Sequence, residues 1–192
     1  MSYKQESYIY HGVPSSFVGE KLYPLFQLKE LFPQIYEKEI EKYNDHPQRK
    51  LLPFKRINPL NCVRGDVLHF SAIHPALVFK ALKSVFPESN RSVKFFKIPI
   101  MNIDKNSAVL FDMNRPEYEF GKDDPDSVFD LIDPKNYQEI GSIPNEAILF
   151  YQEWRDCGEV GAPAWGKIPH VFVLGSLNTA KCEIIDWRDD IA

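Results

Sequence analysis

His11 and Gly12 are the neighbouring residues in this chain whose types point most directly to chemistry. They close a short run, residues 8–13, whose aromatic and β-branched side chains predict a strand ending before Pro14. An imidazole can donate or accept a proton near neutral pH, and a glycine beside it needs no side-chain room. The pair therefore predicts a pocket for a flat, phosphorylated small molecule at the tip of the first strand. The structural alternative is a histidine bonded to backbone and a glycine that relaxes a strand corner.

Metal binding and several nucleotide chemistries lack their characteristic spacing in this sequence. His69 and His74 stand on an expected strand-to-turn segment, with no H-E-x-x-H helix and no cysteine pair to complete a site. No P-loop, G-x-G-x-x-G turn or G-x-S-x-G elbow occurs either. We therefore expect no metal and no hydrolase, triphosphatase or Rossmann assignment. Cys62, near Arg64, has no identifiable orienting base and is interpreted as a buried or incidental cysteine.

The composition predicts one globular domain over residues 1–192, in a reducing, cytoplasmic setting. The chain has 192 residues, 44% of them hydrophobic, and a formal net charge of -4. Such a charge gives nucleic acid no general attraction. The three cysteines are odd in number and form no C-x-x-C, which argues against a disulfide framework. No apolar stretch reaches the roughly 18 residues of a membrane span, so no membrane partner is expected.

Periodicity and turn residues predict the elements that must position these side chains. Strands are expected at residues 8–13, 67–71, 93–98, 108–112, 171–174 and 183–187, and helices at residues 24–32, 33–43, 75–86 and 142–157. Ser142 is the expected N-cap of the last helix, and Gly158 lies just beyond its end. Residues 114–136, with five aspartates and three prolines, are expected to be an exposed acidic excursion. The whole predicts an α+β fold: a mixed, mainly antiparallel split β-sheet core with peripheral helices.

The order of these parts resembles the ADP-ribosyltransferase fold. The resemblance rests on the run Tyr10 to Val13, on the run Asp66 to Ser71 leading into helix 75–86, on strand 93–98, and on the closing run Val171 to Leu177. It is nearest to the His-Gly branch, which includes rifampin ADP-ribosyltransferases, RNA 2'-phosphotransferases and nucleic-acid-modifying toxins. The resemblance implies NAD as co-substrate, with a small-molecule site and an acceptor that the sequence does not identify.

The same resemblance assigns roles to particular residues. His11 and Gly12 would hold the adenosine ribose and the nicotinamide part of NAD, and Phe70 and Ser71 would wall the nicotinamide. The bottom-up alternatives are a core role for Phe70 and a turn role for Ser71.

Many members of the family carry an acid at the start of a late strand, and the comparable residue here is His170. A neutral imidazole could accept a hydrogen bond or act as a base, whereas a protonated one would oppose an oxocarbenium ion. Glu146, Glu153 and Asp66 are the alternative acids. Two functions remain open: an NAD-dependent ADP-ribosyltransferase-like enzyme, or a catalytically silent α+β domain that binds a ligand or a protein.

Overall fold

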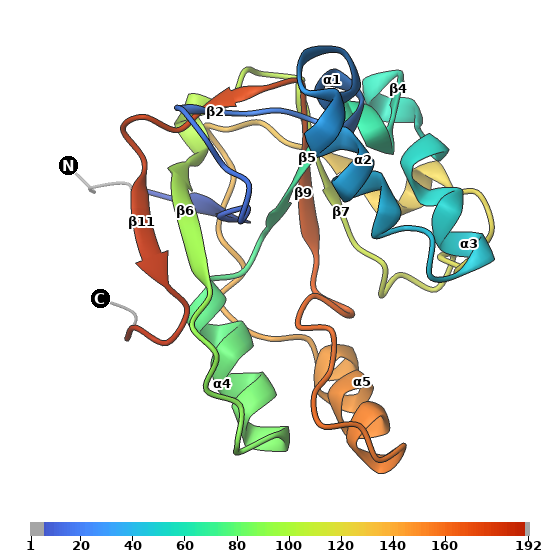
Figure 1. The fold of residues 1–192 in the computed structure, drawn as a ribbon, viewed down its shortest axis with the longest axis vertical. Helices are drawn as coiled ribbons and strands as arrows, with labels where there is room; N and C mark the ends of the chain where they lie inside the picture. Colours follow the sequence, from blue (N-terminus) through green and yellow to red (C-terminus); the bar gives the residue numbers. More distant parts are fainter. Residues whose placement is uncertain (1–5, 191–192) are drawn as a thin grey trace.

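A seven-stranded antiparallel sheet forms the centre of the protein in a computed structural model that describes residues 6–190 (Figure 1). The strand order is β11-β6-β1-β5-β9-β7-β8. The strands are β1 (Tyr8–Gly12), β5 (Val67–Ser71), β6 (Lys94–Pro99), β7 (Ala108–Phe111), β8 (Phe129–Leu131), β9 (His170–Leu174) and β11 (Glu183–Asp186). Strands from both ends of the chain share this sheet. The prediction of an α+β fold with an antiparallel sheet is therefore confirmed.

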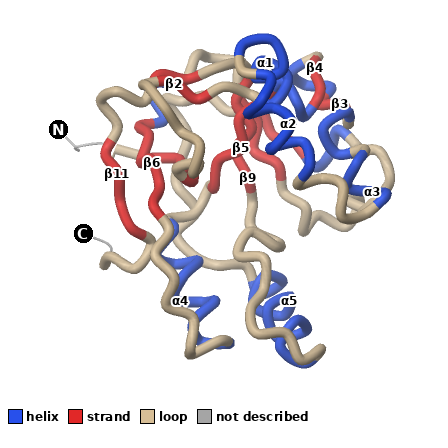
Figure 2. The backbone as a smooth tube through the Cα atoms, viewed as in Figure 1, coloured by secondary structure: helices blue, strands red, loops and turns tan. Residues whose placement is uncertain are grey.

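Shorter elements surround the sheet, joined by long loops (Figure 2). Two small ladders pair β2 (Lys21–Leu22) with β10 (Leu177–Asn178) and β3 (Arg56–Ile57) with β4 (Cys62–Val63). The helices are α1 (Leu25–Leu31), α2 (Pro33–Glu41), α3 (Pro47–Lys50), α4 (Pro75–Val85) and α5 (Asn145–Asp156), and the 3-10 turns are η1 (Leu52–Phe54), η2 (Asn58–Leu60), η3 (Arg64–Asp66), η4 (Ile100–Asn102) and η5 (Asp126–Val128). Within residues 6–190, no helix combines the length and apolar character that a membrane crossing requires.

Helix α4 is bounded by the residues that the sequence analysis used to predict it. His74 precedes Pro75 and caps the helix, because its Nδ1 accepts a hydrogen bond from the backbone N–H of Ala76 at 3.2 Å. The helix ends before Phe86, and Pro87 disfavours helical backbone in the residue before it. One stripe of α4 packs on the sheet through the buried residues Val78, Leu82 and Val85.

Helix α5 begins later than predicted. Pro144 takes the N-cap position and no side chain caps the helix, so the prediction that Ser142 is the N-cap is wrong. The prediction that Gly158 lies just beyond the end of the helix is confirmed, since this residue has a φ of +84° and follows the last turn. The N–H groups of Gly158 and Glu159 donate to the carbonyls of Arg155 and Trp154 at 2.9 and 3.1 Å, which is a Schellman closure.

The two halves of the sheet are joined by a single registered pair. Strand β1 shares five registered pairs with β6, and β5 shares five with β9. Between β1 and β5 the only registered pair is Tyr10 with Ser71. Beyond that pair β1 continues with β6, as the hydrogen bond from Val13 N to Lys94 O at 2.8 Å shows. The sheet therefore opens at the end of β1, beside His11 and Gly12.

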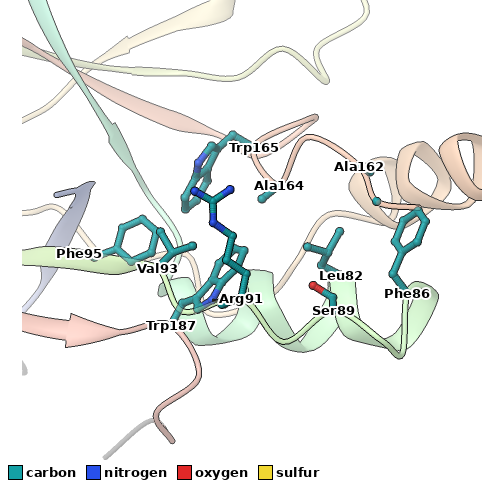
Figure 3. Close-up of a pocket in the computed structure, with 11 residues that line it drawn as sticks. Leu82, Phe86, Ser89, Arg91, Val93, Phe95, Ala162, Ala164, Trp165 and Trp187 are labelled. Carbon is teal, nitrogen blue, oxygen red and sulfur yellow. Dashed lines mark hydrogen bonds between the residues drawn. The ribbon is translucent and has the colours of Figure 1, made fainter. Parts of the chain in front are cut away.

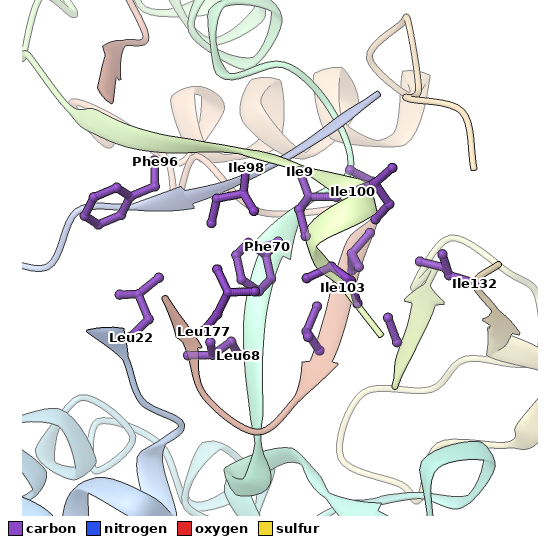
Figure 4. Packing of buried hydrophobic residues seen from close by; sticks show 14 residues of the cluster. Ile9, Leu22, Leu68, Phe70, Phe96, Ile98, Ile100, Ile103, Ile132 and Leu177 are labelled. Carbon is purple, nitrogen blue, oxygen red and sulfur yellow. The ribbon is translucent and has the colours of Figure 1, made fainter. Parts of the chain in front are cut away.

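One face of the sheet, which we call the Phe70 face, carries a continuous core. The register places Ile9 and His11 of β1 on this face together with Phe70 of β5 and Phe96 of β6. Leu22 of β2, Leu177 of β10 and residues of η4 pack against these side chains (Figure 4). The cluster consists of Ile9, Leu22, Leu68, Phe70, Ala72, Phe96, Ile98, Ile100, Ile103, Ala108, Ile132, Val171, Val173 and Leu177.

The opposite face, which we call the Phe172 face, has two separate covers. Helices α4 and α5 pack over the β6 and β1 side, together with Phe95 and Trp187. Residues from β3, η2 and η5 pack over the β7 and β9 side, around Phe111 and Phe172. Figure 1 shows α4 and α5 at one end of the molecule and α1, α2 and α3 at the other. His69 and His170 lie on this face and keep partial exposure.

The last two predicted strands do not lie side by side. Strand β9 pairs with β5 and β7 in the middle of the sheet, whereas β11 pairs with β6 at its edge. The chain between them forms β10, which pairs with β2 outside the main sheet. Between β9 and β11 the chain therefore crosses the sheet and does not form a hairpin, and the short link after Gly175 does not reveal this path.

The acidic segment, residues 114–136, is not simply an exposed excursion, and this prediction is wrong at its centre. Asp124 is buried between two cations: its Oδ2 accepts from Arg64 Nη2 at 2.6 Å and its Oδ1 lies 3.2 Å from Lys55 Nζ. The segment also contributes β8 and buries Val128, Phe129 and Ile132. A carboxylate can be buried when cations and hydrogen bonds replace its water, and this pairing is not visible in local sequence.

Replacing Asp124 by Asn is expected to lower the free energy of unfolding by about 3 to 5 kcal/mol, because Arg64 and Lys55 would remain buried without a carboxylate. Asp123→Asn, at the exposed neighbouring position, is the matched control and should change stability by less than about 0.5 kcal/mol. Urea denaturation followed by circular dichroism measures both. Equal losses in the two variants would contradict the structural role of Asp124.

Candidate functional site

The candidate site lies where β1 and β5 separate, and His11 is its central residue. Its ring meets the Phe70 ring edge to face, with 5.3 Å between centroids. Burial lowers the pKa of His11 to about 4, although the hydrogen bond to Gly12 and the charge of Glu39 act in the opposite direction. The side chain nevertheless keeps partial exposure. His11 is therefore a neutral imidazole at pH 7, densely surrounded but still reachable.

The hydrogen bond of His11 determines its tautomer. Nδ1 lies 2.7 Å from the carbonyl oxygen of Gly12, and a carbonyl oxygen can only accept. Nδ1 must therefore carry the proton, which leaves the lone pair of the neutral ring on Nε2. This nitrogen is an acceptor suited to a hydroxyl group. His11 can thus donate a hydrogen bond to the backbone through Nδ1 and still accept one from a ligand through Nε2. The two interpretations of this histidine are therefore compatible.

The contribution of Gly12 to the site is its carbonyl oxygen, and not the room left by its missing side chain. A Cβ at this position would meet only Phe95 Cε1 at 3.7 Å, an ordinary contact, and it would point to the Phe172 face. The expectation that the missing side chain makes room for a ligand beside His11 does not match this geometry. What Gly12 contributes is the acceptor oxygen that orients the imidazole.

Phe70 and Ser71 lie beside the opening, but their side chains are engaged in packing and hydrogen bonds within the fold. Phe70 is 0% exposed and belongs to the core of its face, so it supports His11 and is not free to stack on a ligand. Ser71 is buried, and its Oγ donates to Ile73 O at 2.7 Å while accepting from Ile73 N at 3.1 Å. The core and turn alternatives describe these two residues better than a nicotinamide wall.

His170 lies on the other face of the sheet from His11. It pairs with Ser71 and Phe111 across the neighbouring strands, and its ring centroid is 6.2 Å from that of Phe172. Burial and the nearby charge of Arg64 lower its pKa to about 4. The structure therefore does not bring His170 together with His11 and Gly12. Its neutral state at pH 7 removes the repulsion that a charged imidazole would exert on a cationic sugar.

His69 and Arg64 form a second group with His170 around the Phe172 ring. His69 lies 4.5 Å from Phe172 between ring centroids, and the Arg64 guanidinium lies 5.3 Å from the same ring. His69 Nε2 is 3.3 Å from the carbonyl oxygen of Arg64, so Nε2 donates. Burial, followed by the charges of His170 and Arg64, lowers the pKa of His69 to about 3. The sequence analysis considered His69 only as a metal ligand and missed this grouping.

Glu39, on α2, is the carboxylate whose charge acts on His11. Its side chain is 27% exposed and its Oε2 pairs with Lys42, one turn further along. An exposed lysine partner of this kind holds a carboxylate weakly. The sequence analysis did not name Glu39. The helical pattern could have pointed to it, because Glu39 lies on the same stripe of the predicted helix as Tyr36, Ile40 and Tyr43.

Helix α2 carries Glu39 without being part of the core. None of its residues is fully buried. Tyr43, just after the helix, has a pKa raised by burial and shifted in turn by the charges of Arg49, Glu39 and Arg64. The charge of Glu39 therefore acts on the pKa values of both Tyr43 and His11.

The alternative acids lie elsewhere. Glu146 and Glu153 are exposed on α5, which covers the β6 and β1 side of the Phe172 face. Asp66 accepts from Val63 N at 3.1 Å and closes the turn η3. Glu139 accepts from Tyr10 Oη at 2.6 Å, and Tyr10 points to the Phe172 face. Each of these carboxylates has a structural position away from His11.

His11 does not line either of the two cavities described next. Two cavities, of about 440 and about 300 Å³, lie elsewhere, one beside α4 and one beside η1. In the part of the chain that the structure describes, no three His, Cys, Asp or Glu side chains are arranged to hold a metal ion. Comparison of the chain with protein-family models, with curated proteins and with solved structures finds no match.

Acidification is expected to destabilise the fold through His11, His69 and His170, whose pKa values are lowered to about 4, 3 and 4. In the unfolded chain these groups protonate near pH 6.5, so below that pH the unfolded state binds more protons. Stability is therefore complete above about pH 6.5, and it falls by up to about 1.4 kcal/mol per pH unit per histidine until the folded pKa values are reached.

Urea denaturation between about pH 7 and pH 4.5 measures this slope. His170→Gln should reduce the slope, because it removes one of these three imidazoles, whose pKa values are lowered in the fold. A slope that is insensitive to His170 would show that this imidazole is not held neutral by the fold.

Gly12→Ala is expected to be tolerated, with a change in unfolding free energy below about 1 kcal/mol, because the added methyl meets Phe95 at an ordinary contact distance. The hydrogen bond from His11 to the residue 12 carbonyl should also survive. The Nδ1–H signal of His11 in proton NMR is the readout. Its loss in this variant would mean that a glycine conformation orients the ring.

Proposed function

We propose that this protein is an NAD-dependent ADP-ribosyltransferase-like enzyme whose site is the opening between β1 and β5. The observation that carries the proposal is the position of His11, a neutral imidazole at the single-pair junction of the two sheet halves, within the electrostatic reach of Glu39. The order of strands and helices that resembles the ADP-ribosyltransferase fold supports it. The opening of the sheet beside the His-Gly pair adds a second, geometric support.

The residues at the opening suit a ribose. His11 Nε2 is an acceptor, and a ribose hydroxyl is a donor of matching type. The neutral charge of the imidazole also avoids repulsion of a positively charged nicotinamide ring. Phe70, packed against the ring, keeps the imidazole from rotating. The proposed roles are thus binding for His11, orientation for the Gly12 carbonyl, and support for Phe70.

Glu39 is proposed in the role for which the sequence offered His170 and, as alternative acids, Glu146, Glu153 and Asp66. A carboxylate attracts the positive charge that develops on the sugar as nicotinamide leaves, and a partly dehydrated site strengthens this attraction. NAD supplies a ribosyl carbon whose bond to the nicotinamide nitrogen breaks with its electron pair leaving on nicotinamide. An acceptor nucleophile, or water, bonds to the same carbon and gives up a proton, and we assign the role of the base that takes it to Glu39.

Incubation of the full chain with NAD should release nicotinamide, measured by chromatography. Glu39→Gln should slow this release by about a hundredfold, because it removes the charge and the base while keeping the shape. Glu37→Gln, at an exposed position on the same helix, is the matched control and should keep the rate. Equal rates in wild type and Glu39→Gln would contradict the assignment of Glu39.

Binding is tested separately by thermal shift, because a ligand that prefers the folded state raises the midpoint. NAD at millimolar concentration should raise the midpoint of the wild type, and His11→Ala should abolish the shift. No shift with NAD would overturn the site itself. A shift without nicotinamide release would instead assign the protein to the silent binding class.

A further inference from the structure

One cavity of the protein lies away from His11, between α4, the segment leading into β6, and the chain that follows α5. Its volume is about 440 Å³, within the range of small-molecule sites. Four of the eleven residues that line it are aromatic, and Figure 3 shows their rings. The residues that define it are Leu82, Phe86, Arg91, Phe95, Trp165 and Trp187. We call this space the tryptophan cavity.

The aromatic walls are held in place by the fold. Phe95 is 1% and Trp187 5% exposed, and the Trp187 ring packs 5.2 Å from Phe79 between centroids. Trp165 meets Phe95 edge to face at 5.4 Å. The facing chain contributes Gly161 and other small residues, which leave space between the walls. The cavity is therefore preformed, with flat apolar surfaces that suit a planar ring.

Arg91 gives the tryptophan cavity its charge. It is the one charged residue of the lining, and its backbone carbonyl accepts from Trp187 Nε1 at 2.7 Å, which ties it to the wall. Figure 3 shows its side chain extending past Trp187 toward Trp165. Among residues 6–190, Arg91 has no carboxylate within ion-pair distance. Asp186, near the same strand end, is bonded to Arg188 and Ser92 instead.

We propose that the tryptophan cavity binds a small molecule made of a planar aromatic ring and one anionic group. The rings of Trp165 and Trp187 would bury the aromatic part, and the Arg91 guanidinium would pair with the anion. The site is independent of the proposed NAD site. Phe95 belongs to the Phe172 face, whereas His11 belongs to the Phe70 face.

Indole N–H signals in proton–nitrogen NMR spectra of the full chain test this proposal, because the chain has three tryptophans. Naphthalene-2-carboxylate should shift the signals of Trp165 and Trp187. It should also bind about fivefold more tightly than the neutral naphthalene-2-carboxamide, since it alone can pair with an exposed guanidinium. Acetate, an anion without a ring, should shift neither signal.

Arg91→Gln should abolish the preference for the carboxylate while both probes still bind through the aromatic walls. Arg91→Lys should retain part of the preference. Lys50→Gln, which removes an exposed cation on α3 at the far end of the molecule, should leave both affinities unchanged (Figure 1). Trp165→Ala should lower the affinity for both probes by the same factor, because it removes an aromatic wall and keeps the charge of Arg91.

Three outcomes would overturn the proposal. The first is the absence of any shift of Trp165 and Trp187 at millimolar probe. The second is equal affinity of the carboxylate and the carboxamide for the wild type. The third is a shift of the same two signals on dilution without a probe, which would assign the tryptophan cavity to contact with a second copy of the chain.

Discussion

The pairing of Tyr10 with Ser71 is the constraint on which the candidate site depends. Strand β1 pairs with β6 along its whole length, and β5 pairs with β9 along its whole length. The two halves of the sheet are therefore joined through one registered pair. Beyond that point the twist of each half carries the strands apart. The opening exposes the end of β1 while the Phe70 ring closes its base.

Charge in this protein follows the rule that a buried group is either neutral or paired. His11, His69 and His170 have lowered pKa values and are held neutral by burial. Asp124, more deeply buried, is bonded to Arg64 and Lys55. Arg64 links the two situations, because its guanidinium pairs with Asp124 and its charge disfavours protonation of the neighbouring imidazoles. The acidic segment thus helps to set the charge state of the Phe172 face.

Local patterns predicted most of the regular elements and few of the contacts. The helix expected at residues 75–86 is Pro75–Val85, and the strand expected at residues 67–71 is found at those bounds. Apart from the N-cap of α5, the main misses share one cause. Strand β8, the buried Asp124 and the partners of β11 all depend on segments that meet across long stretches of chain. The His11-Gly12 pair could be singled out from two neighbouring letters, whereas the influence of Glu39 on the pKa of His11 depends on where helix α2 docks, which local sequence does not predict.

By itself the sequence determined the α+β class, the helices with their proline starts, and the strand that ends in His11 and Gly12. These follow from apolar periodicity and from backbone preferences of single residues, which operate over a few positions. Only the tertiary structure decided that the side chains of Phe70 and Ser71 are engaged within the fold, that His170 faces away from His11, and that the charge of Glu39 acts on the pKa of His11. Those outcomes depend on strand register and helix docking, where a shift by one residue exchanges the faces of a strand.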